Sequence, residues 1–140
     1  INPESGASIT LAGGDHWNPR NLFHYGDRDG IGSQALLQHP LAVCWWEQRQ
    51  RLIVADSYNH RIKLIDPTEG TIQSWLGNGS AGFKDGKNEQ AAFSEPSGLA
   101  ISRDGRTLYI ADTNNHAIRR VATEGGEVST LQCTSGIATT

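Results

Sequence analysis

The sequence contains no methionine and only two cysteines among its 140 residues. Neither cysteine belongs to a C-x-x-C motif, so the chain lacks the spacing of a zinc site or a dithiol redox centre. No apolar stretch approaches the roughly 18 residues that a membrane-crossing helix needs. With 19% charged residues and a net charge of -3, the chain also lacks the basic excess of a nucleic-acid-binding surface. A soluble globular chain remains, and its start at Ile1 without methionine leads us to expect a piece of a longer protein.

Glycine, in contrast, is abundant, with 16 residues, which is typical of a turn-rich all-β chain. The longest feature of the sequence is a repeat with an offset of 56 residues. Leu52–His60, with the sequence LIVADSYNH, recurs at Leu108–His116 as LYIADTNNH. The match extends without a gap from Gly26 to the end of the second copy. A constant period of this size predicts a repeat architecture in which each unit buries its faces against its neighbours.

Each copy contains four short apolar runs separated by Asp, Asn and Gly turns, a pattern that predicts four β-strands. In the first copy the expected strands are 42–46, 51–55, 61–65 and 71–75, and in the second they are 98–102, 107–111, 117–121 and 127–131. The second run of each copy is apolar without alternation, which indicates a strand covered on both faces. In the third run Arg61 and Lys63 alternate with apolar residues, so we expect solvent closer to that strand. A four-stranded sheet packed between similar sheets is a propeller blade.

Residues 8–12 resemble the last strand of a repeat, so we interpret them as the outer strand of a preceding blade. The expected organisation is then an outer strand at 1–13, a loop at 14–38, a blade at 39–77, a loop at 78–94, a blade at 95–132 and a tail at 133–140. Cys44 falls in the first strand of its blade and Cys133 follows the last strand of the other. These places lie at opposite edges, so we expect no disulfide between the two cysteines.

The repeat units resemble NHL repeats. The residues that carry the resemblance are PSGLA at 96–100, LYIADTNNHAIR at 108–119 and GEVSTL at 126–131. Further strings at 21–23, 26–30, 37–41 and 55–60 are similar to the last blades of those family members in which a thioredoxin-like domain precedes the propeller. The resemblance runs from about Leu11 to Leu131.

The resemblance implies an all-β fold, a β-propeller of NHL repeats, with about two and a quarter four-stranded blades of a six-bladed ring present here. It implies a non-catalytic scaffold that binds protein or ligand within a larger thioredoxin-like/NHL protein. No redox motif is carried over, because the thioredoxin-like part is absent from this sequence. Implied partners are a protein, together with the remaining blades of a parent chain or symmetric copies of this one. We expect no cofactor, no metal, no nucleic acid and no membrane.

Four repeated polar residues are the first candidates for binding, namely Asp56, His60, Asp112 and His116. Each aspartate ends the second strand of its copy, where a carboxylate either caps the following turn or faces the mouth of the propeller channel. The histidines recur once per blade, which favours a structural role, because a catalytic site needs one of each group. Two histidines a blade apart do not by themselves make a metal site.

A second candidate is the aromatic-rich insertion before the first full copy. Trp17, Phe23, His24 and Tyr25 lie in a stretch that is longer than its counterpart in the second copy. Such a loop either contacts a partner or packs on its own blade. Asp27, Asp29 and Asp85 lie in Gly-containing loops, but the spacing lacks the remainder of a calcium-loop pattern. We expect turns there, and another flexible turn at Asn78-Gly79-Ser80, which matches a glycosylation sequon.

Two alternative functions stay open at this point. One is a metal-dependent propeller lyase, which requires histidines that converge on the channel axis together with Tyr or Arg. The other is an RNA-binding NHL module, for which Arg61, Lys63, Arg119 and Arg120 form modest basic spots, although no stacking aromatics lie among them. Assembly is open as well, because two blades do not close a ring and their outer faces would expose apolar sheet. Three copies would supply six blades with cyclic symmetry.

Overall fold

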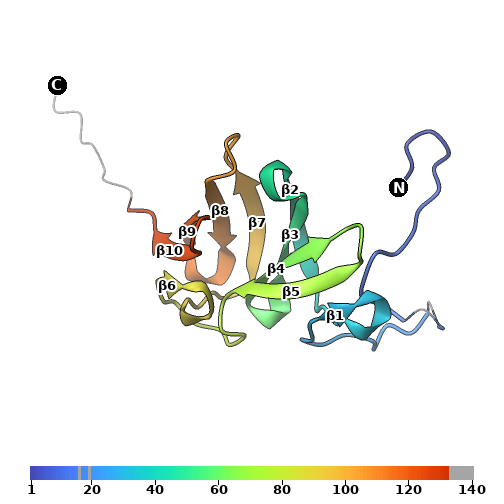
Figure 1. The fold of residues 1–140 in the computed structure, drawn as a ribbon. Coiled ribbons are helices and arrows are strands. Elements are labelled where there is room, and N and C mark those ends of the chain that lie inside the picture. Colours follow the sequence, from blue (N-terminus) through green and yellow to red (C-terminus); the bar gives the residue numbers. More distant parts are fainter. Residues whose placement is uncertain (16, 19, 133–140) are drawn as a thin grey trace, which may run out of the picture.

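The computed structural model describes residues 1–15, 17–18 and 20–132. It contains two five-stranded antiparallel sheets (Figure 1). Blade one consists of β1 (Gly30–Ile31), β2 (Pro40–Trp46), β3 (Arg51–Asp56), β4 (Arg61–Asp66) and β5 (Thr71–Leu76), in the order β1-β5-β4-β3-β2. Blade two consists of β6 (Gly86–Lys87), β7 (Pro96–Ile101), β8 (Thr107–Asp112), β9 (Ala117–Ala122) and β10 (Glu127–Thr130), in the order β6-β10-β9-β8-β7.

The four long strands of each blade confirm the expected runs to within one or two residues at each end. The additional strands, β1 and β6, come from the loops expected at 14–38 and 78–94, and each pairs with the outer strand of its blade. Residues 8–12, interpreted above as a strand, form none here, since a strand requires a hydrogen-bonded neighbour and every pair in the two sheets begins at Gly30 or later.

Five single-turn 3₁₀ helices complete the described secondary structure. They are η1 (Gly32–Gln34), η2 (Glu47–Arg49), η3 (Ser57–Asn59), η4 (Asn88–Gln90) and η5 (Thr113–Asn115). The turns after η3 and η5 end on His60 and His116, which adopt left-handed φ angles of 53° and 51°. No helix within the described residues has the length and apolarity to span a membrane.

The two blades stack face to face, with β2 and β3 of blade one against β7 of blade two (Figure 1). The core between them is built from the inward-facing positions of both sheets, together with Phe93 and Ala91 from the connecting loop. The members of this core are Trp46, Ile53, Ala55, Ile62, Leu76, Ala91, Phe93, Leu108, Ile110, Val121 and Val128. Burial of each large side chain stabilises the fold by about 1.5–3 kcal/mol. Stacked antiparallel sheets joined by short loops are neighbouring blades of a β-propeller.

The outer face of blade one remains partly open. Leu41, Val43 and Trp45 of β2 are exposed there, and a shallow hollow of about 320 Å³ runs beside them. A smaller cluster of Val54, Ile65 and Ile72 is covered on this face by Ala35 from the preceding loop and by neighbouring apolar residues. The expectation of an exposed apolar sheet face therefore holds at β2.

Candidate functional site

A fully buried ion pair stands at the same place in each blade. In blade one, Lys63 Nζ lies 2.8 Å from Oδ2 of Asp56, and in blade two, Arg119 Nη1 lies 2.7 Å from Oδ2 of Asp112. All four side chains have no exposed surface. Neither aspartate side chain makes an N-cap hydrogen bond to the 3₁₀ helix that follows it. The two carboxylates thus serve the interior of each blade.

The remaining bonds of these carboxylates fasten the loop that enters each blade. Oδ1 accepts the backbone N–H of the residue two positions before β2 or β7, from Gln38 at 2.7 Å in blade one and from Ser94 at 2.8 Å in blade two. Oδ2 also accepts from the amide of the asparagine three residues later, Asn59 or Asn115, at 2.8 Å. Each aspartate is therefore a hub that joins a loop, a turn and the neighbouring strand.

The prediction of basic surface residues on the third of the four long strands of each blade is wrong at two of its four positions. Lys63 and Arg119 are buried in the ion pairs, and only Arg120 is exposed. Arg61 is held by Oδ2 of Asp27 at 2.7 Å and by the carbonyl of Gly77 at 2.7 Å. The alternation of charge along this strand therefore marks an internal network and not a solvated face, because a cation with enough partners can be buried.

The aspartates of the Gly-containing loops belong to the same network. Burial would raise the pKa of Asp27, but hydrogen bonds from Lys63 and Arg61 outweigh it and hold the pKa below the usual 3.8. Burial would likewise raise the pKa of Asp85, but hydrogen bonds from Thr130 and Arg119 outweigh it and lower that pKa. Asp29 accepts the N–H of Ser74 at 2.9 Å and its hydroxyl at 2.8 Å. All three carboxylates attach their loops to the strands of the blade.

The repeated histidines occupy equivalent turns in different surroundings. The Nδ1 atom of His60 accepts the backbone N–H of Glu95 across the blade junction at 3.1 Å. Nearby, the hydroxyl of Ser57 donates to the carbonyl of Pro96 at 2.5 Å. His116 is exposed, because no blade of the described chain lies beyond it. The pair of histidines is thus separated by a whole blade and does not converge.

The aromatic insertion extends away from the sheets. The exposed fraction is 96% for Trp17 and 84% for Phe23, and Tyr25 is half-exposed. His24 is partly buried, with Nε2 at 3.3 Å from the carbonyl oxygen of Ser33. These side chains do not cluster with the aspartates or histidines of the repeats. Trp17 and Phe23 therefore do not pack on the blade, His24 contacts the carbonyl of Ser33, and contact of this loop with a partner stays a prediction.

The cysteines offer no reactive centre within the described chain. Cys44 is half-buried and free, and burial raises the pKa of its thiol. A thiol with a raised pKa is a weak nucleophile at neutral pH. Cys133, for which no disulfide was expected, lies outside the described residues.

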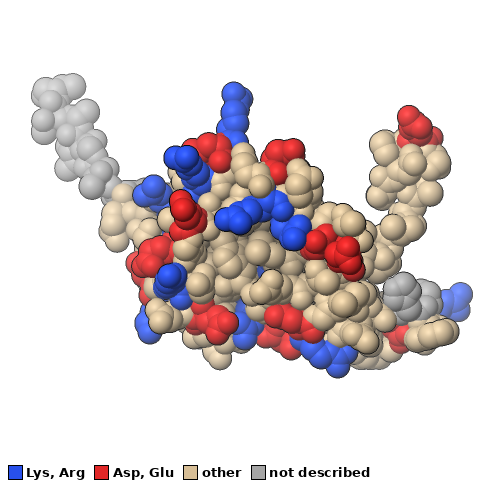
Figure 2. All heavy atoms as spheres, in the orientation of Figure 1, with Lys and Arg blue, Asp and Glu red and all other residues tan. Residues whose placement is uncertain are grey.

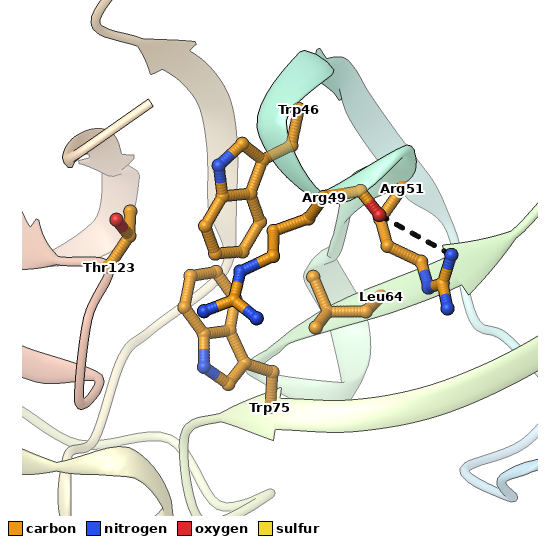
Figure 3. A pocket seen from close by; sticks show the side chains of 6 residues that line it. All are labelled: Trp46, Arg49, Arg51, Leu64, Trp75 and Thr123. Carbon is orange, nitrogen blue, oxygen red and sulfur yellow. Dashed lines mark hydrogen bonds between the residues drawn. The ribbon is translucent and has the colours of Figure 1, made fainter. Parts of the chain in front are cut away.

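A pocket of about 350 Å³ lies at the junction between the blades, near the β2–β3 turn. Its lining residues are Trp46, Arg49, Arg51, Leu64, Trp75 and Thr123. Figure 3 shows five of these side chains on blade one and Thr123 on the loop after β9. On the face drawn in Figure 2, acidic and basic groups are mixed, and groups of both signs lie near this turn.

The two indole rings of the pocket stack on each other. Their centroids lie 5.3 Å apart with an interplanar angle of 26°. Trp46 is 6% exposed and belongs to the core, whereas Trp75 is half-buried and reaches the pocket. The guanidinium of Arg49 lies over the Trp46 ring at 5.7 Å, and Figure 3 shows its side chain extending toward both indoles. An apolar wall and a cation therefore share one hollow.

None of the main pocket residues of blade one is repeated in blade two. At the offset of 56 residues, Trp46, Arg49, Arg51 and Trp75 become Ser102, Gly105, Thr107 and Leu131, and Leu64 becomes Arg120. Of the residues that do recur, both aspartates and His60 make internal hydrogen bonds, whereas His116 is exposed. The chain therefore separates a repeated structural set from a unique set that lines an open pocket.

Comparison with known proteins agrees with the repeat pattern. Residues 93–121 match the family model described as the NHL repeat. The chain carries an NHL repeat. It is 48% identical over 128 residues to Protein SUPPRESSOR OF QUENCHING 1, chloroplastic, of Arabidopsis thaliana, covering 91% of this chain and 12% of that protein. It is 45% identical over 130 residues to NHL repeat-containing protein 2 of Bos taurus, covering 92% and 18%. The chain thus spans less than a fifth of these relatives.

Solved structures agree with the NHL blade at the level of fold. An auxiliary nutrient binding protein from Bacteroides ovatus superposes with a TM-score of 0.61 at 24% identity, covering 77% of this chain and 26% of that one. A Bacteroides thetaiotaomicron protein named as a candidate phosphatase gives 0.68 at 22% identity, covering 88% and 26%. Identities this low establish the propeller architecture and nothing about chemistry.

The sequence pattern points to the repeated polar residues and does not indicate the pocket. Its lining residues come from β2, η2, β3, β4, β5 and the loop after β9, and Trp46 and Thr123 are 77 positions apart, so no local motif identifies them. The signal that was available is the mismatch between copies. Two tryptophans and two arginines that lack counterparts 56 residues later are the positions at which a repeat protein departs from its own pattern.

Proposed function

We propose that this NHL chain is a section of a six-bladed propeller that acts as a non-catalytic binding scaffold within a larger thioredoxin-like/NHL protein. The observation that carries the proposal is the division between repeated residues that serve internal contacts and unique residues that line the Trp46–Trp75 pocket. A scaffold needs one distinctive surface on an otherwise regular frame. The much greater length of the relatives supports a larger parent protein.

The chemistry of the described residues supports binding over turnover. Within residues 1–15, 17–18 and 20–132, no three His, Cys, Asp or Glu side chains are grouped so that they could hold a metal ion. The propeller lyase would need converging histidines, and His60 and His116 lie a blade apart. An RNA-binding face would need exposed cations, and two of its four candidates are buried.

The open faces of the blades support partners of two kinds. His116 and Thr113 occupy the positions at which His60 and Ser57 bind the next blade, and the Thr113 hydroxyl also contacts that of Ser97, so we expect a further blade of the same type to dock onto blade two here. This blade comes from a parent chain or from another copy of this chain. A partner protein would in turn contact the exposed aromatic loop that carries Trp17, Phe23 and Tyr25.

The test is a fragment titration of the ¹⁵N-labelled chain, followed by the indole N–H signals of its tryptophans. Trp46→Phe and Trp75→Phe assign the two pocket signals, while Trp17 and Trp45 report on other surfaces. We expect fragments of several charge types to move the pocket signals first and to be recovered unchanged. Chemical conversion of a fragment, or shifts only at other surfaces, would overturn the scaffold proposal.

A further inference from the structure

The lining of the junction pocket has one sign of charge. It contains two arginines and no aspartate or glutamate. Arg51 forms an ion pair with Asp66, with Nη2 at 3.1 Å from Oδ2, and 40% of its side chain is exposed. Arg49 is exposed, and no carboxylate within the described part of the chain lies at ion-pair distance from it. A cation without an internal partner attracts an anionic group.

The wall beside these cations is flat and apolar. The half-buried ring of Trp75 and the side chain of Leu64 form it, and Trp46 supports Trp75 from the core side by stacking. The indole N–H groups of Trp46 and Trp75 have no acceptor among the described residues. Planar rings stack on such a surface with a gain beyond simple area burial. The wall therefore favours a flat group over a flexible chain.

The size of the hollow limits the ligand. About 350 Å³ is at the lower end of the range for small-molecule sites, which is roughly 300–1,000 Å³. One or two fused rings fill such a space. A second hollow of about 460 Å³ shares Trp75 and Thr123 with the pocket and is lined on its far side by Lys87 and Glu89. A longer molecule therefore has a continuous path away from the arginines.

We propose that the junction pocket binds aromatic carboxylates, an assignment that rests on the scaffold function above. The ring lies against Trp75 and Leu64, and the carboxylate accepts hydrogen bonds from the Arg49 guanidinium, with Arg51 adding positive potential. A guanidinium matches a carboxylate through two parallel N–H donors, which a neutral ring substituent does not satisfy. Such a group occurs in a free aromatic acid and in a peptide that ends in Phe, Tyr or Trp.

The experiment titrates the labelled chain with naphthalene-2-carboxylate and, in parallel, with its neutral analogue naphthalene-2-methanol. The readout is the Kd from the indole N–H shifts of Trp46 and Trp75. Loss of one charge-assisted hydrogen bond weakens binding by about 10-fold or more. We expect the carboxylate to bind at least about 10-fold more tightly than the alcohol, and Arg49→Gln to abolish this difference.

Two further variants control for general effects. Arg120→Gln removes an exposed arginine whose neighbours on β9, Arg119 and Val121, face the core, so its side chain lies on the opposite face of blade two. It should leave the Kd unchanged. Trp75→Leu installs the residue that blade two carries at the equivalent position, and it should weaken both ligands by about 5-fold through lost stacking. Arg49 is exposed, so the Arg49→Gln result stands even where Trp75→Leu impairs folding.

The outcomes separate the inference from the scaffold proposal. Equal binding of the acid and the alcohol at the pocket, or equal effects of Arg49→Gln and Arg120→Gln, would overturn the carboxylate assignment and leave the scaffold standing. If no fragment shifted either pocket signal, both the carboxylate assignment and the scaffold proposal would be overturned. Gly-Gly-Phe and its C-terminal amide identify the source, because binding of the acid form alone supports a peptide terminus, and binding of naphthoate without the peptide supports a free acid.

Discussion

The two blades bury a cation at the same position by different means. In blade one, Lys63 is neutralised by Asp56 at 2.8 Å and by Asp27 at 2.7 Å, and it donates to the carbonyl of Leu36 at 3.3 Å. In blade two, Arg119 binds Asp112 at 2.7 Å and Asp85 at 2.9 Å. The backbone frame is nevertheless the same. The requirement is thus a satisfied cation at this position and not a particular residue.

The arginine of blade two has a wider set of partners than the lysine of blade one. Nη1 and Nη2 reach the carbonyls of Ala92 and Lys84 at 2.9 and 2.7 Å, and the guanidinium lies 5.0 Å from the rings of both Phe83 and Phe93. Its Nε has no partner among the described atoms. Phe83 stands where blade one has Asp27. The cation and this neighbour therefore differ together, Lys with Asp and Arg with Phe.

The largest expected effect comes from removing the shared aspartate of either blade. Asp56→Ala or Asp112→Ala leaves a buried cation with one carboxylate fewer and frees two N–H donors, so we expect a loss of about 3–5 kcal/mol in the free energy of unfolding. Urea denaturation of each variant measures it. An exposed acidic control, Glu127→Ala, should change it by less than about 0.5 kcal/mol. A loss in the control range for either aspartate would contradict the role of hub.

A smaller effect distinguishes the two cation sites. Arg119→Lys removes the planar donor set and the contact with Phe83, so it should cost about 1–3 kcal/mol. Adding Phe83→Asp supplies the second carboxylate that Lys63 has in blade one and should restore part of the loss. The coupling energy from the double-mutant cycle is expected at about 0.5–3 kcal/mol. Additive losses would show that the residues at 83 and 119 vary independently.

The smallest effect concerns the histidines. His60→Ala deletes the acceptor for the N–H of Glu95, whereas His116→Ala deletes an exposed ring. Both place alanine in a left-handed turn, so that cost cancels between them. Thermal unfolding should show His60→Ala less stable than His116→Ala by about 1 kcal/mol. Equal stability of the two variants would mean that the bond across the junction contributes nothing.

Much of the fold was predictable because apolar runs and turn residues repeat in step. The short strands β1 and β6 were not, since two residues that include a glycine carry no strand pattern. The burial of Lys63 and Arg119 was also missed, because a charged residue that alternates with apolar ones normally points to water. The register of the β3–β4 hairpin indicates that Lys63 and Asp56 share one face. Asp56 lies opposite Arg61, which places Lys63 two residues further on the same face.

The candidate site was predictable only in part for a related reason. Asp56 and His60 were candidates because they recur in the second copy, yet the residues that recur in a repeat protein are mainly those that hold its blades together. The pocket depends on Trp46 and Trp75, whose proximity follows from β2 and β5 both contributing to one junction. That proximity requires the three-dimensional stacking of blades, which spacing along the chain does not encode.

The attachment of the connecting loop decides where such a protein divides into exchangeable parts. Arg61 of blade one holds the carbonyls of Gly77 and Asn78, at 2.7 and 3.3 Å. From Gly82 onward the loop is bound by blade two, through Asn115 at 2.8 Å, apart from Asn88, which accepts the N–H of Gly77, and Glu95, which donates to His60. The seam therefore falls between residues 78 and 82, ahead of the loop and not at the first strand. A transplanted module that starts there carries its own entry loop, and a cut at residue 95 would leave the loop behind.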